Sequence, residues 1–425
     1  EVRSGNADAD LASWWTAFDD PVLTDLVSRA AAENLDLRQA LARLNEARAR
    51  RGLARTEYYP DLDVSAGASR SRSGGSGDIR ESYMAGFDAG WEIDVFGGVR
   101  RSVEAAEADL AAAAANLNDV RVSLAAETAL SYMEIRTLQA RLESAVQNLA
   151  SQSETHDLVK FRFEAGLTDE LALEQARYQL ENTRSRVPAL RAALDAAKNR
   201  LSVLVGQAPG AVDELVNAAR PVPEAPKLAA SGIPAETLRR RPDIRKAERE
   251  LAAQTARIGA ATADLYPRFT LSGGIGYESA ESGDLFTAGS RYWSIGPGVS
   301  WKVFDAGAIR RNIEIQNALQ EQALIAYEQE VLSALEEVKT AMSAYVEDQS
   351  SLESQIRAAE SARRAEALAR DYYLAGMADF GDVLEAQRAV LSFADQVAES
   401  QGAVAADLIR LYKALGGGWE GVAED

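Results

Sequence analysis

Side chains that commonly carry catalysis or bind metals are scarce in this sequence. It contains no Cys, which excludes disulfide scaffolds, thiolate zinc sites and thiol nucleophiles. His156 is the only histidine, so there is no imidazole pair for a metal and little basis for a Ser-His-Asp triad. No phosphate-binding loop of the P-loop or dinucleotide type is present. We therefore expect no enzyme activity, no metal and no cofactor.

Carboxylates dominate the ionisable residues. The chain has 65 Asp and Glu against 46 Lys and Arg, a formal net charge of −19. A nucleic-acid partner would call for a basic footprint, so we exclude one. In so acidic a chain, carboxylates lie near each other by chance, and no pair identifies a catalytic site.

Proline and glycine divide the sequence into helical tracts and strand regions. Seven of the eleven prolines lie between Pro188 and Pro242, and this stretch is predicted to connect two halves. Residues 99–163 contain neither Pro nor Gly, which permits a very long helix. Glycine clusters at 67–98 and 273–307 together with aromatic residues, a composition typical of strands and turns.

The two halves repeat each other at a nearly constant spacing. Trp91 and Gly97 recur 210 positions later as Trp301 and Gly307. Other pairs recur in the same way: Ala165-Gly166 as Ala375-Gly376 at a spacing of 210, and Tyr59-Pro60 as Tyr266-Pro267 at a spacing of 207. We predict two copies of one unit, which consists of a helix, two strands, a long helix, a turn and a second long helix.

Each copy contains two segments in which apolar and polar residues alternate. This pattern predicts strands with one apolar and one polar face. It also fits a soluble sheet packed on a core. The segments are about 9–13 residues long, which suits tilted membrane-spanning strands. Aromatic residues lie on the apolar face near the strand ends, as at membrane interfaces: Tyr83, Trp91, Tyr277, Trp293 and Trp301.

Four such strands cannot form a membrane barrel alone. The smallest outer-membrane barrels have about eight strands, and an open sheet edge is not tolerated in lipid. If these strands span a membrane, several chains must supply one barrel.

The remaining tracts are predicted to form two long helical hairpins. Large apolar residues such as Val103, Leu110 and Leu117 recur every seven positions, a period typical of supercoiled helices. Each hairpin turns at an Ala-Gly pair, where glycine accepts the left-handed backbone that ends a helix. A structural coiled-coil protein is an alternative interpretation, but it would not need strand pairs between its helices.

Over nearly its whole length the sequence resembles the TolC-like outer-membrane efflux channels, in the branch that serves tripartite drug and metal pumps of the RND type. The resemblance is carried by the following motifs: Trp14-Trp15 with Phe18 and Asp20-Pro21; Trp91-Glu92-Ile93-Asp94-Val95-Phe96-Gly97; Arg239-Arg240-Arg241-Pro242-Asp243-Ile244-Arg245; Tyr266-Pro267; and Phe304-Asp305-Ala306-Gly307.

The resemblance implies a mainly α fold with a membrane β-barrel portion. A homotrimer would form a twelve-stranded barrel in outer-membrane lipid and a helical tunnel in the periplasm. The chain would be a passive exit duct for drugs, toxic compounds or metals, working with a periplasmic adaptor and an inner-membrane pump. A duct for type I protein secretion is the alternative within the same fold.

The expected organisation follows the chain order. It comprises an N-terminal equatorial segment and first helix (1–58), a strand pair (59–98), a helical hairpin (99–205), a proline-rich equatorial connector (206–242), a helix (243–265), a second strand pair (266–306), a second hairpin (307–415) and a tail (416–425). The branch often carries a lipidated Cys. Since the sequence begins at Glu1 and has none, we expect a chain that is trimmed past this Cys or lacks it.

The resemblance also assigns the hairpin ends. The turns Ala165-Gly166 and Ala375-Gly376 would form the periplasmic tip, where the channel closes and the adaptor docks. Asp382 and Glu385 would face the pore as acidic rings, and Tyr373 would take part in the closing contacts. A ring of carboxylates favours cations.

Overall fold

The computed structural model describes residues 11–72, 79–226 and 239–419. Parts of four predicted segments lie outside this range: residues 1–10 of the equatorial segment, 73–78 of the first strand pair, 227–238 of the connector and 420–425 of the tail. The chain divides into two compact units. Unit 1 comprises Glu1–Ala40, Leu117–Pro242 and Val331–Asp425, and unit 2 comprises Leu41–Asn116 and Asp243–Glu330.

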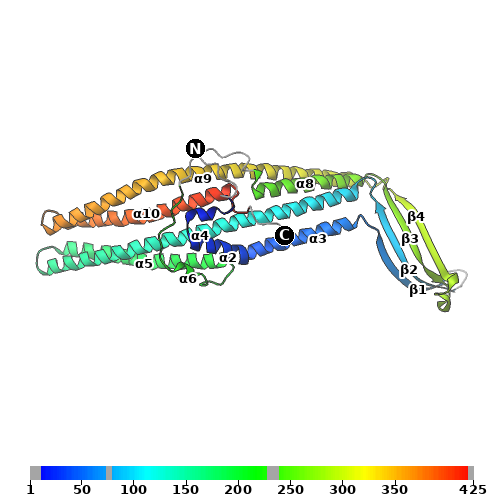
Figure 1. Ribbon diagram of the computed structural model, residues 1–425, viewed down its shortest axis with the longest axis horizontal. Coiled ribbons are helices and arrows are strands. Elements are labelled where there is room, and N and C mark those ends of the chain that lie inside the picture. The colour runs from blue at the N-terminus through cyan, green and yellow to red at the C-terminus, as the bar shows by residue number, and fades with distance from the viewer. Residues whose placement is uncertain (1–10, 73–78, 227–238, 420–425) are drawn as a thin grey trace. The chain divides into compact units, whose positions relative to one another are not determined.

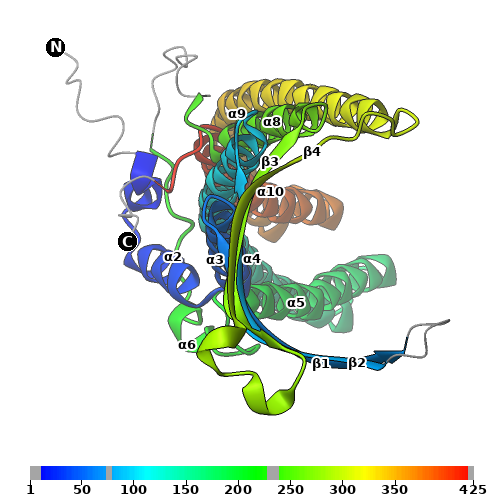
Figure 2. The ribbon, with the colours of Figure 1, turned by 90° about the vertical axis from the view of Figure 1, so that its right-hand side faces the viewer.

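Unit 2 contains a four-stranded antiparallel sheet in which the strands follow chain order (Figure 1). The strands are β1 (Asp61–Arg72), β2 (Ile79–Ile93), β3 (Arg268–Ser279) and β4 (Arg291–Ser300). Two short 3-10 helices, η2 (Ser282–Asp284) and η3 (Ala288–Ser290), lie between β3 and β4. Seen along the strands, the sheet bends as an arc (Figure 2). The mainly α fold with four strands is confirmed.

The strand registers bring the alternating apolar positions together on one face of the sheet. Val64 lies opposite Phe87, Phe87 opposite Ile275, and Ile275 opposite Trp293. This face is exposed: Val64 is 73% and Trp293 76% accessible. A soluble sheet would bury such a face, because burying apolar surface is what stabilises a half-apolar sheet in water.

The helices reproduce the sequence duplication. Helices α4 (Gly98–Glu164) and α9 (Ala308–Leu374) have 67 residues each, and α5 (Glu170–Leu204) and α10 (Phe380–Ala414) have 35 each. In unit 2, the ends of α4 and α9 that follow the strands lie beside α3 (Leu35–Thr56) and α8 (Pro242–Ala263). The Arg257 guanidinium of α8 lies 2.5 Å from the Asp109 carboxylate of α4.

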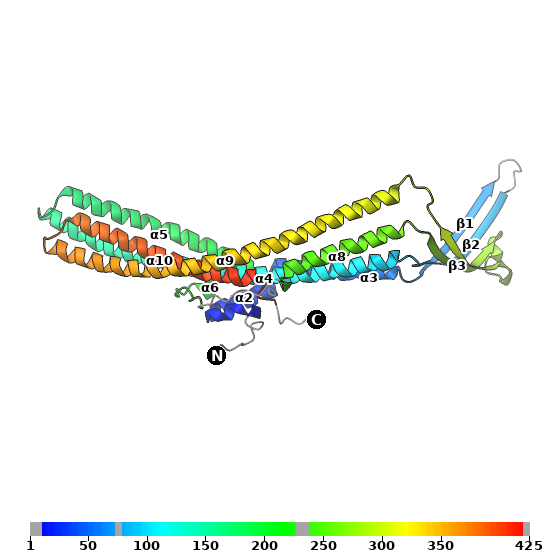
Figure 3. The same cartoon turned by 90° about the horizontal axis from the view of Figure 1, so that it is seen from above.

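In unit 1 the two hairpins α4–α5 and α9–α10 lie side by side (Figure 3). Pro188 lies inside α5, within the bounds 99–205 predicted for the first hairpin, so the proline-rich stretch from Pro188 to Pro242 is not a connector along its whole length. Proline costs one backbone hydrogen bond within a helix. The long apolar seam of α5, with Val187, Leu194 and Leu201 buried, compensates for that loss.

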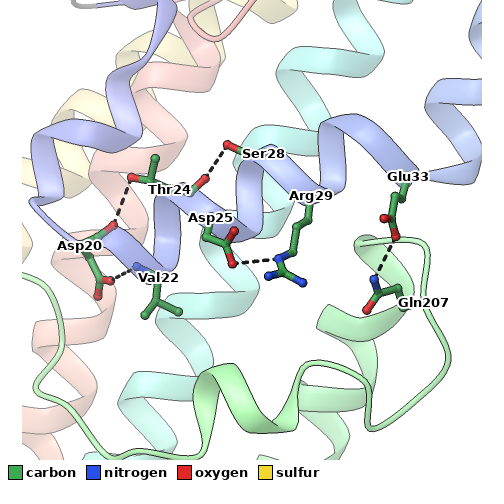
Figure 4. A network of polar contacts seen from close by, with 8 residues as sticks. All are labelled: Asp20, Val22, Thr24, Asp25, Ser28, Arg29, Glu33 and Gln207. Carbon is green, nitrogen blue, oxygen red and sulfur yellow. Dashed lines mark hydrogen bonds and ion pairs between the residues drawn. The ribbon is translucent and has the colours of Figure 1, made fainter.

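The core of unit 1 forms around the start of the chain. Trp14 and Phe18 of the 3-10 helix η1 (Trp14–Phe18) pack with Leu23 of α2 (Pro21–Glu33) against α4, α5 and α10. The Asp20 carboxylate caps α2 by accepting a hydrogen bond from the backbone N–H of Val22 at 2.8 Å (Figure 4). It also accepts one from the backbone N–H of Leu23 at 3.3 Å. Pro21 suits the first helical position because its missing N–H would have no helical partner.

The same carboxylate ties α2 to α4. The Tyr132 hydroxyl donates to Asp20 Oδ2 at 2.5 Å. Burial, followed by this hydrogen bond, raises the pKa of Tyr132 to about 12, so the phenol stays protonated at neutral pH. The Asp20-Pro21 motif therefore both starts a helix and links it to the core.

The connector is anchored to α4 by a buried arginine that the sequence reasoning missed. Arg136 is fully buried, and its Nη1 donates to the backbone oxygen of Ala218 and to Gln139 Oε1, both at 2.7 Å. Gln139 in turn donates to the backbone oxygen of Val216, at the end of the short helix α6 (Asp213–Val216). Carbonyl oxygens thus partly replace the water that the guanidinium loses on burial.

Candidate functional site

The predicted interface aromatics form two rows on the apolar face of the sheet. Trp91 lies at the end of the sheet that meets the helices, and Trp301 directly follows β4 at the same end. Tyr83, Tyr277 and Trp293 lie toward the opposite end, as the strand registers place them. Tyr83 and Trp91 are eight residues apart, about 26 Å along a strand, or about 20 Å across a bilayer for a strand tilted by about 40°. That spacing is comparable to the apolar band of outer-membrane barrels, which is about 25 Å tall.

The two tryptophans nearest the helices occupy equivalent positions in the repeats. The indole N–H of Trp91 donates to the backbone oxygen of Tyr58 at 3.0 Å, and that of Trp301 donates to the backbone oxygen of Leu265, also at 3.0 Å. Each indole therefore fastens the end of one strand to the end of a preceding helix. An amphipathic ring with a satisfied N–H suits the edge of a bilayer.

Both hairpin turns have the same backbone geometry. In the first, the N–H of Gly166 donates to the oxygen of Phe163, and the N–H of Leu167 donates to the oxygen of Arg162, at 2.9 and 2.8 Å. The second repeats this pattern, with Gly376 to Tyr373 and Met377 to Tyr372, at 3.1 and 2.8 Å. Gly166 and Gly376 have φ of +70° and +74°. This is a Schellman ending, which glycine adopts with the least strain.

Tyr373 lies in a small apolar core beside the second turn. It is 7% exposed, and its ring centroid lies 5.5 Å from that of Phe380 at the start of α10. The equivalent residue of the first repeat, Phe163, is 38% exposed. The repeat symmetry is therefore broken at this position, although the two backbone turns match.

Arg162 covers the Tyr373 ring and links the two hairpins. Its guanidinium carbon lies 4.4 Å from the ring centroid, and its Nη1 donates to the Tyr373 backbone oxygen at 3.4 Å. We did not identify Arg162 from the sequence. The available signal was a basic residue in the last turn of a long helix, where it also interacts favourably with the helix dipole.

Asp382 and Glu385 are exposed on the first turns of α10. Asp382 also belongs to a capping box: its Oδ2 accepts a hydrogen bond from the Asp379 backbone N–H at 3.2 Å, while the Asp379 side chain accepts one from the Asp382 backbone. On the first hairpin, Asp169 caps α5 by accepting a hydrogen bond from the Ala172 N–H at 2.9 Å. The acidic residues beside the turns therefore start helices, and Glu385 takes no part in the cap.

Large apolar side chains are exposed around both turns. On the first hairpin they are Phe161, Leu167 and Leu171, and on the second Tyr372, Leu374 and Met377. Exposed apolar groups gathered at one end of a helical hairpin are typical of a protein-binding surface.

A polar cavity of about 650 Å³ lies in unit 2 where the strands meet the helices. Its carboxylates include Asp109 and Asp264, which pair with Arg257 and Arg268 at 2.5 and 2.6 Å. These ion pairs account for both arginines that line the cavity.

The described residues show neither a cluster of metal-binding side chains nor a membrane-spanning helix. Residues 11–72, 79–226 and 239–419 contain no group of three potential metal-binding side chains. Within the same ranges, none of the helices has a segment apolar enough to cross a bilayer.

Comparison with known proteins gives consistent matches over almost the whole chain. The model of the family described as "Outer membrane efflux protein" matches residues 26–207 and 233–417. Nodulation protein T of Rhizobium leguminosarum bv. trifolii is 32% identical, over 99% of this chain and 91% of that protein. The cation efflux system protein CusC of Escherichia coli O6:H1 is 32% identical, over 96% and 89%.

A solved structure agrees with this match. The outer-membrane channel OprN superposes with a TM-score of 0.92, at 39% sequence identity, and covers 96% of this chain and 93% of its own.

Proposed function

The chain belongs to the outer membrane efflux protein family, and we propose that three copies form the exit duct of a tripartite efflux pump. The protein is located in the outer membrane and acts in efflux. The observation that carries the trimer proposal is the curved four-stranded sheet, which has an exposed apolar face and two edges that no described strand of the same chain covers. If the sheets of three copies closed into one barrel, the backbone N–H and C=O groups of every strand would have hydrogen-bond partners in lipid.

The helical hairpins would continue the duct into the periplasm. We propose that the turns at Ala165-Gly166 and Ala375-Gly376 form its tip and that the exposed apolar residues around them receive a periplasmic adaptor, which in turn connects to an inner-membrane pump. The domain boundaries given above remain predictions and fit this arrangement.

The gate would lie at the same end. Asp382 and Glu385 are accessible to a pore, and threefold symmetry would repeat each carboxylate around the axis. Tyr373, by contrast, is packed inside one chain under Arg162. We propose that Tyr373 supports the gate by holding the second turn and does not itself line the pore.

The transported compounds would be small molecules. Two relatives are named for cation efflux and for toluene efflux. We propose that this chain exports toxic small molecules or metal ions, that it catalyses no reaction, and that the pump supplies the energy.

The proposal is tested by the particle mass in detergent and by conductance in planar bilayers. A particle of three chains that conducts ions supports it, and a monomer without conductance contradicts it. Deletion of the gene should increase sensitivity to toxic compounds or metals, whereas loss of a secreted protein without such sensitivity would indicate a type I secretion duct.

A matched pair of variants tests which face of the sheet meets lipid. Ile295 lies on the exposed apolar face of β4 and Ser294 on the polar face. Ile295→Arg should reduce the amount of assembled trimer in the outer membrane, because arginine on the lipid face costs about 2–4 kcal/mol at mid-bilayer. Ser294→Arg should assemble and make the pore less cation-selective. Equal effects of the two substitutions would contradict the assigned faces.

A further inference from the structure

Strands β1 and β4 are the open edges of the sheet. Each has one hydrogen-bonded neighbour within the chain, so half of its backbone N–H and C=O groups face away from the sheet. Such an edge pairs readily with another strand. In a membrane the pairing is required, because no water is available to satisfy these groups.

The repeat relates the registers inside the sheet. Leu62 of β1 pairs with Ala89 of β2. Moving Leu62 forward by 207 positions and Ala89 by 210, the two spacings of the duplication, leads to Phe269 and Val299. These two residues are themselves paired between β3 and β4. The two spacings found in the sequence therefore convert the register of the β1–β2 pair into the observed register of the β3–β4 pair.

Among the strands that the structure describes, the joint between β2 and β3 has no counterpart within one chain. Its counterpart under the duplication would join β4 to β1, which are opposite edges of the same sheet and must therefore come from two copies. The β2–β3 joint pairs Trp91 with Leu271 and Gly90 with Ser272. The same spacings convert these pairs to Trp301 with Val64 and Ser300 with Ser65.

We propose that β4 of one copy pairs with β1 of a neighbouring copy in this register, so that Trp301 lies opposite Val64 and Ser300 opposite Ser65. The proposal rests on the proposed function only in that the chain assembles into a barrel. It adds which residues meet at the joint. Antiparallel pairing follows, because β1 and β4 run in opposite directions within the sheet.

On the polar face this register brings opposite charges and small hydroxyl groups together: Asp63 lies opposite Lys302, and Ser71 opposite Ser294. On the apolar face Ala66 lies opposite Val299, and toward the strand ends far from the helices Arg70 lies opposite Ile295 and Arg72 opposite Trp293. A two-residue shift in one direction would keep the faces but place Arg72 opposite Arg291 in place of Trp293, and like charges directly opposite each other destabilise a strand pair.

The ends of the strands support the same joint. Strand β2 continues to Ile93, and its last three residues pair with β3 and not with β1, which begins opposite Gly90. The residues after β4 that correspond to 91–93 are 301–303. They lie beyond the end of β4 at Ser300, because the strand they would pair with, β1 of another copy, is not part of the same chain. Trp301 is accordingly 56% exposed against 37% for Trp91. In the assembled protein β4 should extend to Val303.

Pairs of cysteines test the register, since the natural sequence contains none. The matching variants are Ser65→Cys with Ser300→Cys, and Ser71→Cys with Ser294→Cys. The control for a two-residue slip is Ser69→Cys with Ser294→Cys. All replace serines on the same face of the same strands. As a positive control within one chain, Gly90→Cys with Ser272→Cys occupies the equivalent place at the β2–β3 joint, and a Cβ at Gly90 meets no atom within 4 Å.

Oxidation of outer membranes should convert both matching variants to covalent multimers on non-reducing gels. We expect about tenfold less product from the slip control, because opposite residues lie within the Cα range of a disulfide and residues displaced by two do not. Two results would overturn the register. One is that the slip control forms covalent multimers and the matching pairs do not. The other is that neither the matching pairs nor the slip control cross-links while the positive control oxidises. The wild-type particle mass is measured alongside: a monomer overturns the proposed function, whereas a trimer that cross-links out of register overturns only this joint.

Discussion

Asp382 has two roles that substitutions can separate. Its carboxylate is exposed beside the second turn, where it would contribute to an acidic ring, and its Oδ2 also accepts the hydrogen bond from the Asp379 N–H in the capping box. Asp382→Asn removes the charge but keeps an oxygen that can accept this hydrogen bond. Asp382→Ala removes both. The two variants should therefore agree in one measurement and differ in another.

The magnitudes follow from the two interactions. Both variants remove three charges from a trimer, so the cation selectivity measured from the reversal potential in a salt gradient should fall by the same amount in each. Only Asp382→Ala loses the cap interaction, which is worth about 0.5–1 kcal/mol for a hydrogen bond of this kind. That energy corresponds to amide exchange about 2–5 times faster in the first turn of α10.

Glu385→Gln is the control, because Glu385 is equally exposed but takes no part in the cap. It should lower selectivity and leave amide exchange unchanged. Unchanged selectivity in Asp382→Asn would refute the acidic ring at this position. Equal exchange rates in Asp382→Asn and Asp382→Ala would refute the cap as the structural role of this side chain.

Three further predictions concern the turns and the core. Gly376→Ala should destabilise the second turn by about 1 kcal/mol, because Gly376 has a φ of +74° that alanine adopts only with strain. Limited proteolysis measures the effect. Gly381→Ala within α10 is the control and should not destabilise the turn, since in both variants the added Cβ meets no atom within 4 Å. Arg162→Ala should speed amide exchange at Tyr373 about 2–5 times by removing a cation–π contact, whereas Arg177→Ala, which breaks an exposed ion pair, should not. Burial, and then the neighbouring Asp348 carboxyl, raise the pKa of Asp407 above 3.8. The folded state therefore keeps the Asp407 proton to a higher pH than the unfolded chain does. The stability that the protonated carboxyl contributes is fully present below its unfolded-state pKa and is lost as pH rises through its raised folded-state pKa. Asp407→Asn should raise the melting temperature at pH 7 and have less effect near pH 4; a gain that grows on acidification would contradict this sign.

The two repeats match more closely in backbone geometry than in side-chain packing. The two turns share hydrogen bonds and left-handed glycines, and the two junction tryptophans share their acceptors. Phe163 and Tyr373 nevertheless differ in burial at equivalent positions. The small core near the tips therefore takes Tyr373 from the second hairpin, packed with Val159 and Ala172 of the first, and leaves Phe163 outside it. We expect the two hairpins to contribute differently to closure and docking.

Features set by local chemistry could be predicted from the sequence alone. Alternation at every second residue identified the strands and their apolar face, and the proline-free tracts identified the long helices. The Ala-Gly pairs identified the turns, because a left-handed backbone strongly favours glycine whatever surrounds it. The spacings of 207 and 210 even anticipated the relation between two strand joints.

Other features depended on packing between distant segments, and only the tertiary structure decided them. The sequence does not show that Arg162 of α4 covers Tyr373 of α9, or that Arg136 carries the connector, since these contacts join residues far apart in the chain. Pro188 misled the sequence reasoning because the cost of a proline is local, whereas the apolar seam that offsets it is formed with other helices. The double use of Asp382 appeared only when the capping geometry was visible, since an acidic residue near a helix start has the same sequence signature in either role.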